Sequence, residues 1–576
     1  MSTTSAEPTF PREVHATARG PRWLALCVVL ALAAWAPAVW RGGWSYDDRE
    51  VLERNPVVQG SVPWSEAFRR DYWEHVAPAG HFRPIATLSL RVDRSIWGDD
   101  ARGFHATNVL LHAACVAVAG AVLLLASAER LPWFGLALFA VHPVLADSVA
   151  WVSGRTSMLA ALAGLLGALA IASWITPWRD ASPRRAVRVA LAAGLGACCA
   201  LLAKEDGAVF APLYVVLAAG HSRRVASAAA LGALLGVGVY LVLRWQALGS
   251  FAPAATFAPL AEHSLFERAL VGGRAALEGL RLAVAPLGYP PNYERAPMFA
   301  RDSRELTWLG GLGWALLVAL AVGAGVALRR KRSNSAAWSA LLAAASALPM
   351  LQLIPAGALF APRFLYMPLL FAAPLVGRAA ERCCGARLRS FACVALALSV
   401  WGAWSRSEVY SSRAAFHRAQ LAFDPTDARS HNELGLAFEE QGDAAAARSE
   451  FERAIALDPE YGRPWSNLGR LALADRDEAR AEQAFRRAIE LGAGNAQAHT
   501  NLAILLQRQQ RPAEALTYAE RALALAPGLV PAWRVRARAL ADLERFAEAH
   551  DALNRALQLD PQDELTLGLR RELERR

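Results

Sequence analysis

The sequence predicts an all-α protein in two parts, a polytopic helical membrane domain of about eleven spans followed by an α-solenoid. Long apolar segments separated by short charged ones run from Trp23 to about Arg406. From about Asp424 onward the sequence instead repeats every 34 residues. A hydrophobic content of 55% in 576 residues also favours one large membrane domain joined to a smaller domain.

The distribution of charge supports this division and makes nucleic-acid binding a poor explanation of the net charge of +10. From Arg406 onward the chain has 24 arginines, no lysine and 27 acidic residues, so the repeats carry a charge of about −3. The basic excess therefore lies in the apolar part, where basic short loops are typical of the cytoplasmic side of a membrane protein.

The first apolar run, from Trp23 to Trp40, follows a basic N-terminus and is long enough to cross a bilayer. We interpret it as an uncleaved anchor, in preference to a signal peptide, with residue 1 in the cytoplasm. Alternating the later spans then places every strongly basic short loop in the cytoplasm. These spans are expected near residues 105–127, 132–149, 157–176, 187–203, 207–219, 226–246, 306–328, 337–355, 363–378 and 390–405.

Charged residues interrupt the apolar run from Leu265 to Leu287, so we expect an amphipathic helix on the outer face there. The odd number of spans then puts the repeats outside, in the periplasm or exterior, and a bacterial inner membrane is the expected location. The expected parts are a cytoplasmic tail at 1–22, the membrane domain at 23–406 with an outer loop at 41–104, a half-repeat or linker helix at 407–427, four repeat units at 428–563 and a charged tail at 564–576.

Seven cysteines are present, and all lie in or beside apolar segments. Neither the pattern of a secreted disulfide-rich domain nor paired Cys and His spacing occurs. The sequence therefore predicts no disulfide framework and no zinc site.

The repeats have the length of tetratricopeptide (TPR) units. Asp424-Pro425, Asp458-Pro459 and Asp560-Pro561 recur in the same register. Such arrays form a concave surface that can hold a peptide, although a passive spacer would show the same pattern. Asn467 and Asn501 occupy the same inner-face position in two units, where an amide could bond an extended backbone.

Ionisable residues gather at the expected outer ends of the spans. Asp47 and Asp48 begin the outer loop, where adjacent carboxylates are either solvated charges or a general base with a supporting acid. Charges beside a membrane are costly, which favours a functional interpretation, with structural pairing as the alternative. The remaining candidates for binding a substrate or a carrier phosphate are Arg83, His105, His142, Asp147, Arg155, Lys204 and Arg363.

Carboxylates beside several Arg and Lys residues suit transfer from a lipid phosphate. Arginine forks neutralise the leaving phosphate while a carboxylate accepts the proton of the acceptor. Histidines in such helices are more often packing groups than ligands, so we expect no protein-bound metal and leave a requirement for a divalent ion open.

Several stretches resemble the transmembrane and TPR-containing (TMTC) proteins and their bacterial relatives. They include YDDREVLERNP from Tyr46, HFRPIATLSLRVDRSIWG from His81, GFHATNVLLH from Gly103, HPVLADSVAWVSGRTSML from His142 and APRFLYMP from Ala361. The resemblance implies a GT-C-type glycosyltransferase that moves mannose from a dolichyl phosphate carrier to Ser or Thr of proteins. A bacterial chain would use an undecaprenyl carrier, and its sugar need not be mannose.

The resemblance also implies roles for matching residues. Asp47 would be the base with Asp48 supporting it, and Arg155, Lys204 and Arg363 would hold the carrier phosphate. Asp147 stands where relatives usually carry Glu. The expected partners are the lipid-linked sugar donor, the membrane, and a protein or peptide bound by the TPR array.

Two other functions remain open from the sequence. One is a non-catalytic, membrane-anchored TPR scaffold for protein–protein interaction, and the other is a transferase of lipid-linked glycan with a non-protein acceptor. An enzyme predicts that the outer loop and the starts of the fourth, sixth and tenth spans converge on one cavity. A scaffold predicts carboxylates that point apart.

Overall fold

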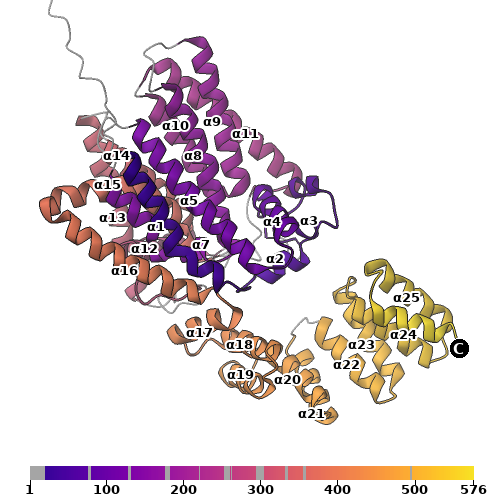
Figure 1. Cartoon of the computed structure of the whole chain (residues 1–576). Helices are drawn as coiled ribbons and strands as arrows, with labels where there is room; N and C mark the ends of the chain where they lie inside the picture. The colour runs from indigo at the N-terminus through magenta and orange to yellow at the C-terminus, as the bar shows by residue number, and fades with distance from the viewer. Residues whose placement is uncertain are drawn as a thin grey trace, which may run out of the picture. The chain divides into compact units, whose positions relative to one another are not determined.

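The computed structural model describes residues 20–74, 79–126, 132–175, 182–219, 221–251, 260, 263–293, 304–330, 335–353, 358–492 and 496–575. These residues form helices and connecting segments without a strand, which confirms the all-α class for them. The chain divides into two compact units, Met1–Phe416 and His417–Arg576 (Figure 1). The predicted N-terminal tail at 1–22 lies outside the described residues as far as residue 19.

Seven helices in the described part of the first unit are long and apolar enough to cross a membrane. Each coincides with a predicted span. They are α1 (Gly20–Trp40), α5 (Ala101–Ala126), α8 (Thr156–Ile175), α9 (Pro183–Ala203), α11 (Arg223–Leu248), α13 (Arg304–Arg330) and α16 (Leu388–Val409).

The other four predicted spans are shorter, interrupted or less apolar helices, so the count of about eleven spans is not confirmed. The segment predicted at 132–149 forms only the nine-residue helix α6 (Trp133–Val141) before Pro143 starts a 3-10 turn. Proline cannot donate the N–H that would continue the helix. The remaining three are α10 (Phe210–Ala219), α14 (Ser335–Ser346) and α15 (Tyr366–Cys384).

Short helices connect these segments at the ends of the bundle. The amphipathic segment predicted at 265–287 forms α12 (Leu265–Val284), which buries Val271, Ala275 and Leu282 and leaves Phe266 exposed. Its position relative to a membrane stays a prediction. The other connections are η2 (Pro143–Leu145), α7 (Ala146–Val149), η3 (Ser153–Arg155), η4 (Glu205–Val209), η7 (Leu348–Leu351), η8 (Pro362–Leu365) and η9 (Gly385–Arg387).

Glycines allow α9 and α11 to approach closely. A Cβ atom on Gly236 would lie 2.1 Å from the carbonyl oxygen of Gly194, so no larger residue fits there without moving a helix. Small residues are typical of such contacts in membranes, because lipid gives helices no hydrophobic reason to associate and close packing must do so. This packing fixes the end of α9, where Lys204 is the C-cap residue.

The predicted outer loop at 41–104 is an ordered helical layer over the described residues. Its helices are α2 (Asp48–Arg54), α3 (Pro56–Gln59), η1 (Trp64–Phe68) and α4 (Pro84–Trp97). Val51, Leu52, Tyr72 and Leu90 from this layer pack with Phe104 of α5 in one apolar cluster. The cluster holds Asp47 at the start of α2 and Arg83 at the start of α4.

The second unit is a stack of helix pairs, as the 34-residue period predicts (Figure 1). Gly469 shows why the period needs a small residue, because a Cβ there would lie 2.6 Å from the Phe485 ring in the paired helix. The pairs are α18 (Ala428–Glu440) with α19 (Ala444–Leu457), α20 (Gly462–Ala474) with α21 (Glu478–Glu490), α22 (Ala496–Arg508) with α23 (Pro512–Leu525), and α24 (Val530–Asp542) with α25 (Phe546–Leu559).

Helices also flank the four pairs. α17 (Arg413–Phe423) lies within the predicted half-repeat or linker at 407–427. The predicted charged tail at 564–576 forms α26 (Glu564–Leu573), and its Leu569 and Leu573 are buried in the apolar core of the array. This last helix therefore covers the end of the stack, as solenoids require.

Candidate functional site

Asp47 and Asp48 are adjacent in sequence but have opposite environments. Asp48 is fully buried, and its carboxylate accepts hydrogen bonds from the backbone N–H and hydroxyl of Ser45 at 3.1 and 3.2 Å. It also accepts from the N–H and hydroxyl of Ser153 at 3.0 and 2.9 Å. By contrast, Oδ1 of Asp47 is buried without a hydrogen-bond partner. Asp48 therefore ties α2 to η3, whereas Asp47 keeps bonding capacity for a substrate.

The two carboxyl groups also differ in acidity. Burial raises the pKa of Asp48 to about 6, against which the bonds from Ser45 and Ser153 act. Burial raises the pKa of Asp47 well above its ordinary value, the charge of Asp48 raises it further, and Arg363 lowers it. A carboxylate with a raised pKa is a stronger base, so Asp47 is suited to accept a proton.

The outer loop contributes a residue that sequence reasoning missed, Tyr72. Its phenol is buried, and the hydroxyl has no hydrogen-bond partner. The guanidinium carbon of Arg83 lies 6.0 Å from the ring centroid, and burial together with the charge of Asp47 raises the pKa of the phenol. No local pattern marks this tyrosine, which is held by the bond from its N–H to the His81 carbonyl.

Arg83 is bound to the carboxylate of Glu205, which begins η4. Nη2 and Nε of Arg83 donate to Oε2 of Glu205 at 3.1 and 3.3 Å. Oε1 of the same carboxylate lies 3.5 Å from Nη1 of Arg244, a residue of α11. Glu205 thus bridges two arginines from the outer loop and the bundle, and these charges lower its pKa in spite of burial.

Lys204 stands beside this bridge at the end of α9. Its ammonium group donates to the Ser157 hydroxyl at 2.7 Å and lies 2.9 Å from Asp206. Burial lowers its pKa, Asp206 opposes that effect, and Arg83 and Arg363 lower the pKa further. The Phe364 ring lies between the two cations, 5.5 Å from Lys204 Nζ and 5.7 Å from the guanidinium carbon of Arg363. The structure therefore brings Arg83, Lys204 and Arg363 together.

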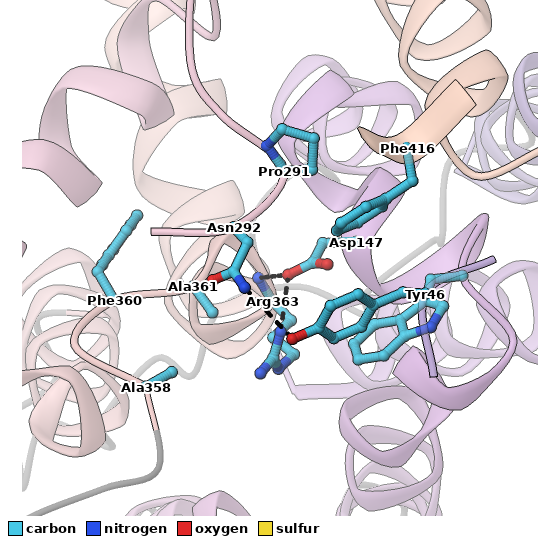
Figure 2. A pocket seen from close by; sticks show the side chains of 10 residues that line it. Tyr46, Asp147, Pro291, Asn292, Ala358, Phe360, Ala361, Arg363 and Phe416 are labelled. Atoms are coloured by element: carbon cyan, nitrogen blue, oxygen red, sulfur yellow. Dashed lines mark hydrogen bonds and ion pairs between the residues drawn. The ribbon is translucent and has the colours of Figure 1, made fainter. Parts of the chain in front are cut away.

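Asp147 orients Arg363 at the other side of the cluster. Its Oδ2 accepts the backbone N–H of Arg363 at 2.9 Å and the guanidinium at 3.4 Å, and its Oδ1 accepts the Tyr410 hydroxyl at 3.1 Å. A cavity of about 50 Å³ adjoins this pair (Figure 2). Its lining consists of Tyr46, Asp147, Trp151, Pro291, Asn292, Ala358, Phe360, Ala361, Arg363 and Phe416.

Tyr46 has a left-handed backbone, with φ of 46°, directly before Asp47. Such a conformation is costly for an aromatic residue and persists only when its surroundings enforce it. The Tyr46 ring stacks on Phe416 with centroids 4.8 Å apart, and its hydroxyl accepts from the amide of Asn292 at 3.2 Å. Both contacts hold the turn that positions Asp47.

The structure places three other predicted residues in packing contacts. Arg155 is fully buried, with Nη1 2.6 Å from Asp93 Oδ2 and Nη2 donating to the Phe104 carbonyl at 3.1 Å. His105 Nε2 lies 3.0 Å from the Gly43 carbonyl, and His142 Nε2 lies 3.2 Å from the Ala283 carbonyl. The contacts of Arg155 and His105 join the outer loop to the helices beneath it, and the contact of His142 joins the end of α6 to α12.

Asn467 and Asn501 share one groove of the second unit. The cavity has a volume of about 310 Å³, and its lining includes both asparagines together with Asn432, Arg470 and Gln497. Asn467 donates to Asn432 at 2.9 Å, and Asn501 accepts from Gln497 at 3.2 Å. The floor of the groove is therefore a row of bonded amides.

The described residues include no group of three or more His, Cys, Asp or Glu side chains arranged to hold a metal ion. The prediction about metals stays a prediction. The positive charges of the site come from Arg and Lys side chains, each of which contacts a carboxylate.

Comparison with known proteins finds a repeat family and a group of transferases to which this chain is similar. Residues 401–462, 433–496, 466–530 and 500–564 match the tetratricopeptide repeat family model, which confirms the predicted repeats. The chain is 35% identical over 171 residues to protein O-mannosyl-transferase Tmtc2 of Drosophila melanogaster, a match to 28% of this chain and 18% of that protein. The chain resembles the TMTC proteins.

Human TMTC2 and TMTC4, also protein O-mannosyl-transferases, are 33% and 29% identical over 168 and 211 residues. The matches cover 28% and 32% of this chain, and the chain spans only 20% and 28% of those relatives. Among solved structures, Pseudomonas aeruginosa PilF is 20% identical with a TM-score of 0.26, covering 34% of this chain and 82% of PilF.

Proposed function

We propose that this chain is an integral-membrane glycosyltransferase that moves a sugar from a polyprenyl-phosphate carrier to Ser or Thr hydroxyls of exported proteins. The observation that carries the proposal is the buried, unbonded Oδ1 of Asp47 near Arg363, which belongs to a cluster of three cations at the ends of membrane helices. A buried carboxylate oxygen without a partner is costly for folding, so its retention is best explained by use. The resemblance to protein O-mannosyl-transferases supports the same reaction.

The chemistry is a single displacement at the anomeric carbon. The acceptor hydroxyl gives its proton to Asp47 while its oxygen forms a bond to the sugar. The bond between that carbon and the phosphate oxygen breaks, and the electron pair leaves with the polyprenyl phosphate. One displacement inverts the anomeric configuration, and the positioning of the two substrates supplies much of the acceleration.

Arg83, Lys204 and Arg363 are the proposed phosphate ligands. Each already contacts a carboxylate, which keeps the cations oriented. A guanidinium has five N–H donors in a rigid fork, so an arginine bound to one carboxylate can still donate to a phosphate. The free Tyr72 hydroxyl is a further donor for the phosphate oxygens.

Asp48, Asp147 and Arg155 act through other residues. Asp48 fixes the turn that carries Asp47, and Asp147 orients Arg363. Arg155 joins α4 to the start of α8 through Asp93. We assign these three to positioning, in place of the direct contact with substrate that the sequence favours.

The proposed orientation follows the charge of the short loops. The N-terminus is cytoplasmic, and the outer loop and the TPR array lie in the periplasm or exterior, as in a bacterial inner-membrane protein. The membrane unit is proposed to have a GT-C-like arrangement. The amides of the TPR groove, Asn467 and Asn501 among them, would bond the backbone of an extended acceptor or partner.

Mass spectrometry of exported proteins tests this function in cells. Loss of the gene product should remove a sugar from Ser or Thr, and the wild-type chain should restore it while Asp47→Asn should not. Glu50→Gln, which removes a charge from the same helix, should restore it as well. Unchanged modification in the deletion strain would favour the scaffold, and a sugar lost only from a glycan would identify a non-protein acceptor.

A further inference from the structure

We propose that the cavity beside Arg363 receives the hydroxyl-bearing side chain of the acceptor, and that its walls set the preference between Ser and Thr. This inference rests on the proposed transfer function. It assigns the acceptor side chain to this cavity, for which the proposed roles of Asp47 and the phosphate ligands name no occupant.

The size of the cavity limits what can occupy it. A water molecule needs roughly 10–15 Å³ of such space, so a volume of about 50 Å³ accepts three to five atoms of that size. The side chain of Thr has three non-hydrogen atoms beyond Cα, and that of Ser has two. A hexose is larger than either side chain, so the volume favours the acceptor side chain as the occupant.

The lining matches a side chain that is part apolar and part hydroxyl. Tyr46, Asn292 and Arg363 supply polar groups that lie near one another (Figure 2). Ala358, Phe360 and Ala361 form an apolar wall that suits a methyl group. Polar groups in an otherwise apolar cavity are what orient a small ligand.

The backbone connects this cavity to the base. Tyr46 lines the cavity, and Asp47 is the next residue, so the left-handed turn at Tyr46 fixes the two side chains relative to each other. Arg363 lines the same cavity and lies close enough to Asp47 to lower its pKa. An acceptor held there therefore lies beside Arg363, the phosphate ligand that also acts on Asp47.

Ala361→Val tests the size of the cavity. The purified chain would be assayed with polyprenyl-phosphate-mannose and two peptides that differ only in Ser or Thr at the acceptor position. The added methyl groups should lower kcat/KM for the Thr peptide about tenfold more than for the Ser peptide, since one methyl in a fitted pocket changes selectivity by roughly 10–200-fold. The ratio is an internal control for folding. Ala372→Val, in α15 away from the cavity, should leave it unchanged.

Asn292→Ala is a second, independent variant. It removes the amide beside Tyr46 and should raise the KM for both peptides several-fold more than the KM for the donor. If the wild type transfers sugar but neither variant changes the Thr-to-Ser ratio or the peptide KM, the inference is overturned while the proposed function stands. A change confined to the donor KM would also overturn it. No transfer to either peptide by the wild type, with mannose or another hexose on the polyprenyl-phosphate donor, would overturn both.

Discussion

The two units use charge in different ways. In the first unit, several ion pairs are buried and join distant segments, such as Arg155 with Asp93 at 0% and 4% side-chain exposure. In the TPR array many ion pairs join neighbouring turns at the helix surface, such as Arg480 with Asp477 at 78% and 40% exposure. Burying a charge costs free energy, whereas exposing one costs little. We therefore expect the charges of the first unit to position other groups or take part in the reaction, and the charges of the array to keep it soluble.

Asp93→Ala should give the largest loss of stability, about 3–5 kcal/mol, because it leaves the Arg155 guanidinium buried and unpaired. The matched change in the array, Arg480→Ala, should leave the melting temperature unchanged. Thermal unfolding of the two purified variants in detergent measures both. Equal shifts in melting temperature for the two variants would contradict the proposed difference between the units.

Gly469→Ala tests whether the stability of the array depends on helix packing. The new methyl group would lie 2.6 Å from the Phe485 ring, so the free energy of unfolding should fall by about 1–3 kcal/mol. Gly568→Ala, in α26 with no atom within 4 Å of the new methyl, should instead raise it by up to about 1 kcal/mol through helix propensity. Denaturant unfolding compares the pair, and a loss of stability in both would contradict the packing account.

Tyr72→Phe should separate stability from activity in the first unit. It removes a buried hydroxyl that has no partner, so stability should be unchanged or slightly higher. Transfer should nevertheless fall about tenfold, the loss of roughly 1.4 kcal/mol of transition-state stabilisation that one hydrogen bond supplies. Steady-state kinetics and a melting curve on the same sample measure the activity and the stability. Full activity of Tyr72→Phe would contradict the proposed role of Tyr72 as a phosphate ligand.

Arg363→Gln should move the pH profile of the reaction. The base form of Asp47 is required, so the rate should rise with pH through a pKa well above the ordinary carboxyl range, which burial and Asp48 raise and Arg363 lowers. Loss of the Arg363 charge should therefore raise the pKa of Asp47 and shift the rise in rate to higher pH. Arg41→Gln, an exposed residue paired with Glu408, should leave it in place. A shift to lower pH in Arg363→Gln would contradict the assignment of Asp47.

Local patterns in the sequence predicted the elements well. Apolar runs predicted the seven long helices and the 34-residue period predicted the repeats, because both are set by residues close together in the chain. The predicted spans that the structure does not confirm contain local signals too, such as Pro143 within the run at 132–149. Weighing that proline against the apolar run would have predicted the short helix α6.

Partners across the fold were not predictable. Asp48 bonds to Ser153, 105 residues away, and Arg155 bonds to Asp93, 62 residues away, so only the folded chain shows that both are committed to packing. Tyr72 is a single tyrosine in a loop, without a repeat or a motif to mark it. The sequence could identify which charges gather at the outer ends, but not which of them remain available to a substrate.

The most direct test of the central claim is a transfer assay with the purified chain in lipid nanodiscs. Radiolabelled polyprenyl-phosphate-mannose and a Ser/Thr peptide are supplied, and sugar on the peptide is counted. The account predicts transfer by the wild type and by Glu50→Gln, with the rate of Asp47→Asn reduced by a factor of roughly 10²–10⁴, as expected for loss of a general base. Transfer by Asp47→Asn at the wild-type rate would contradict it.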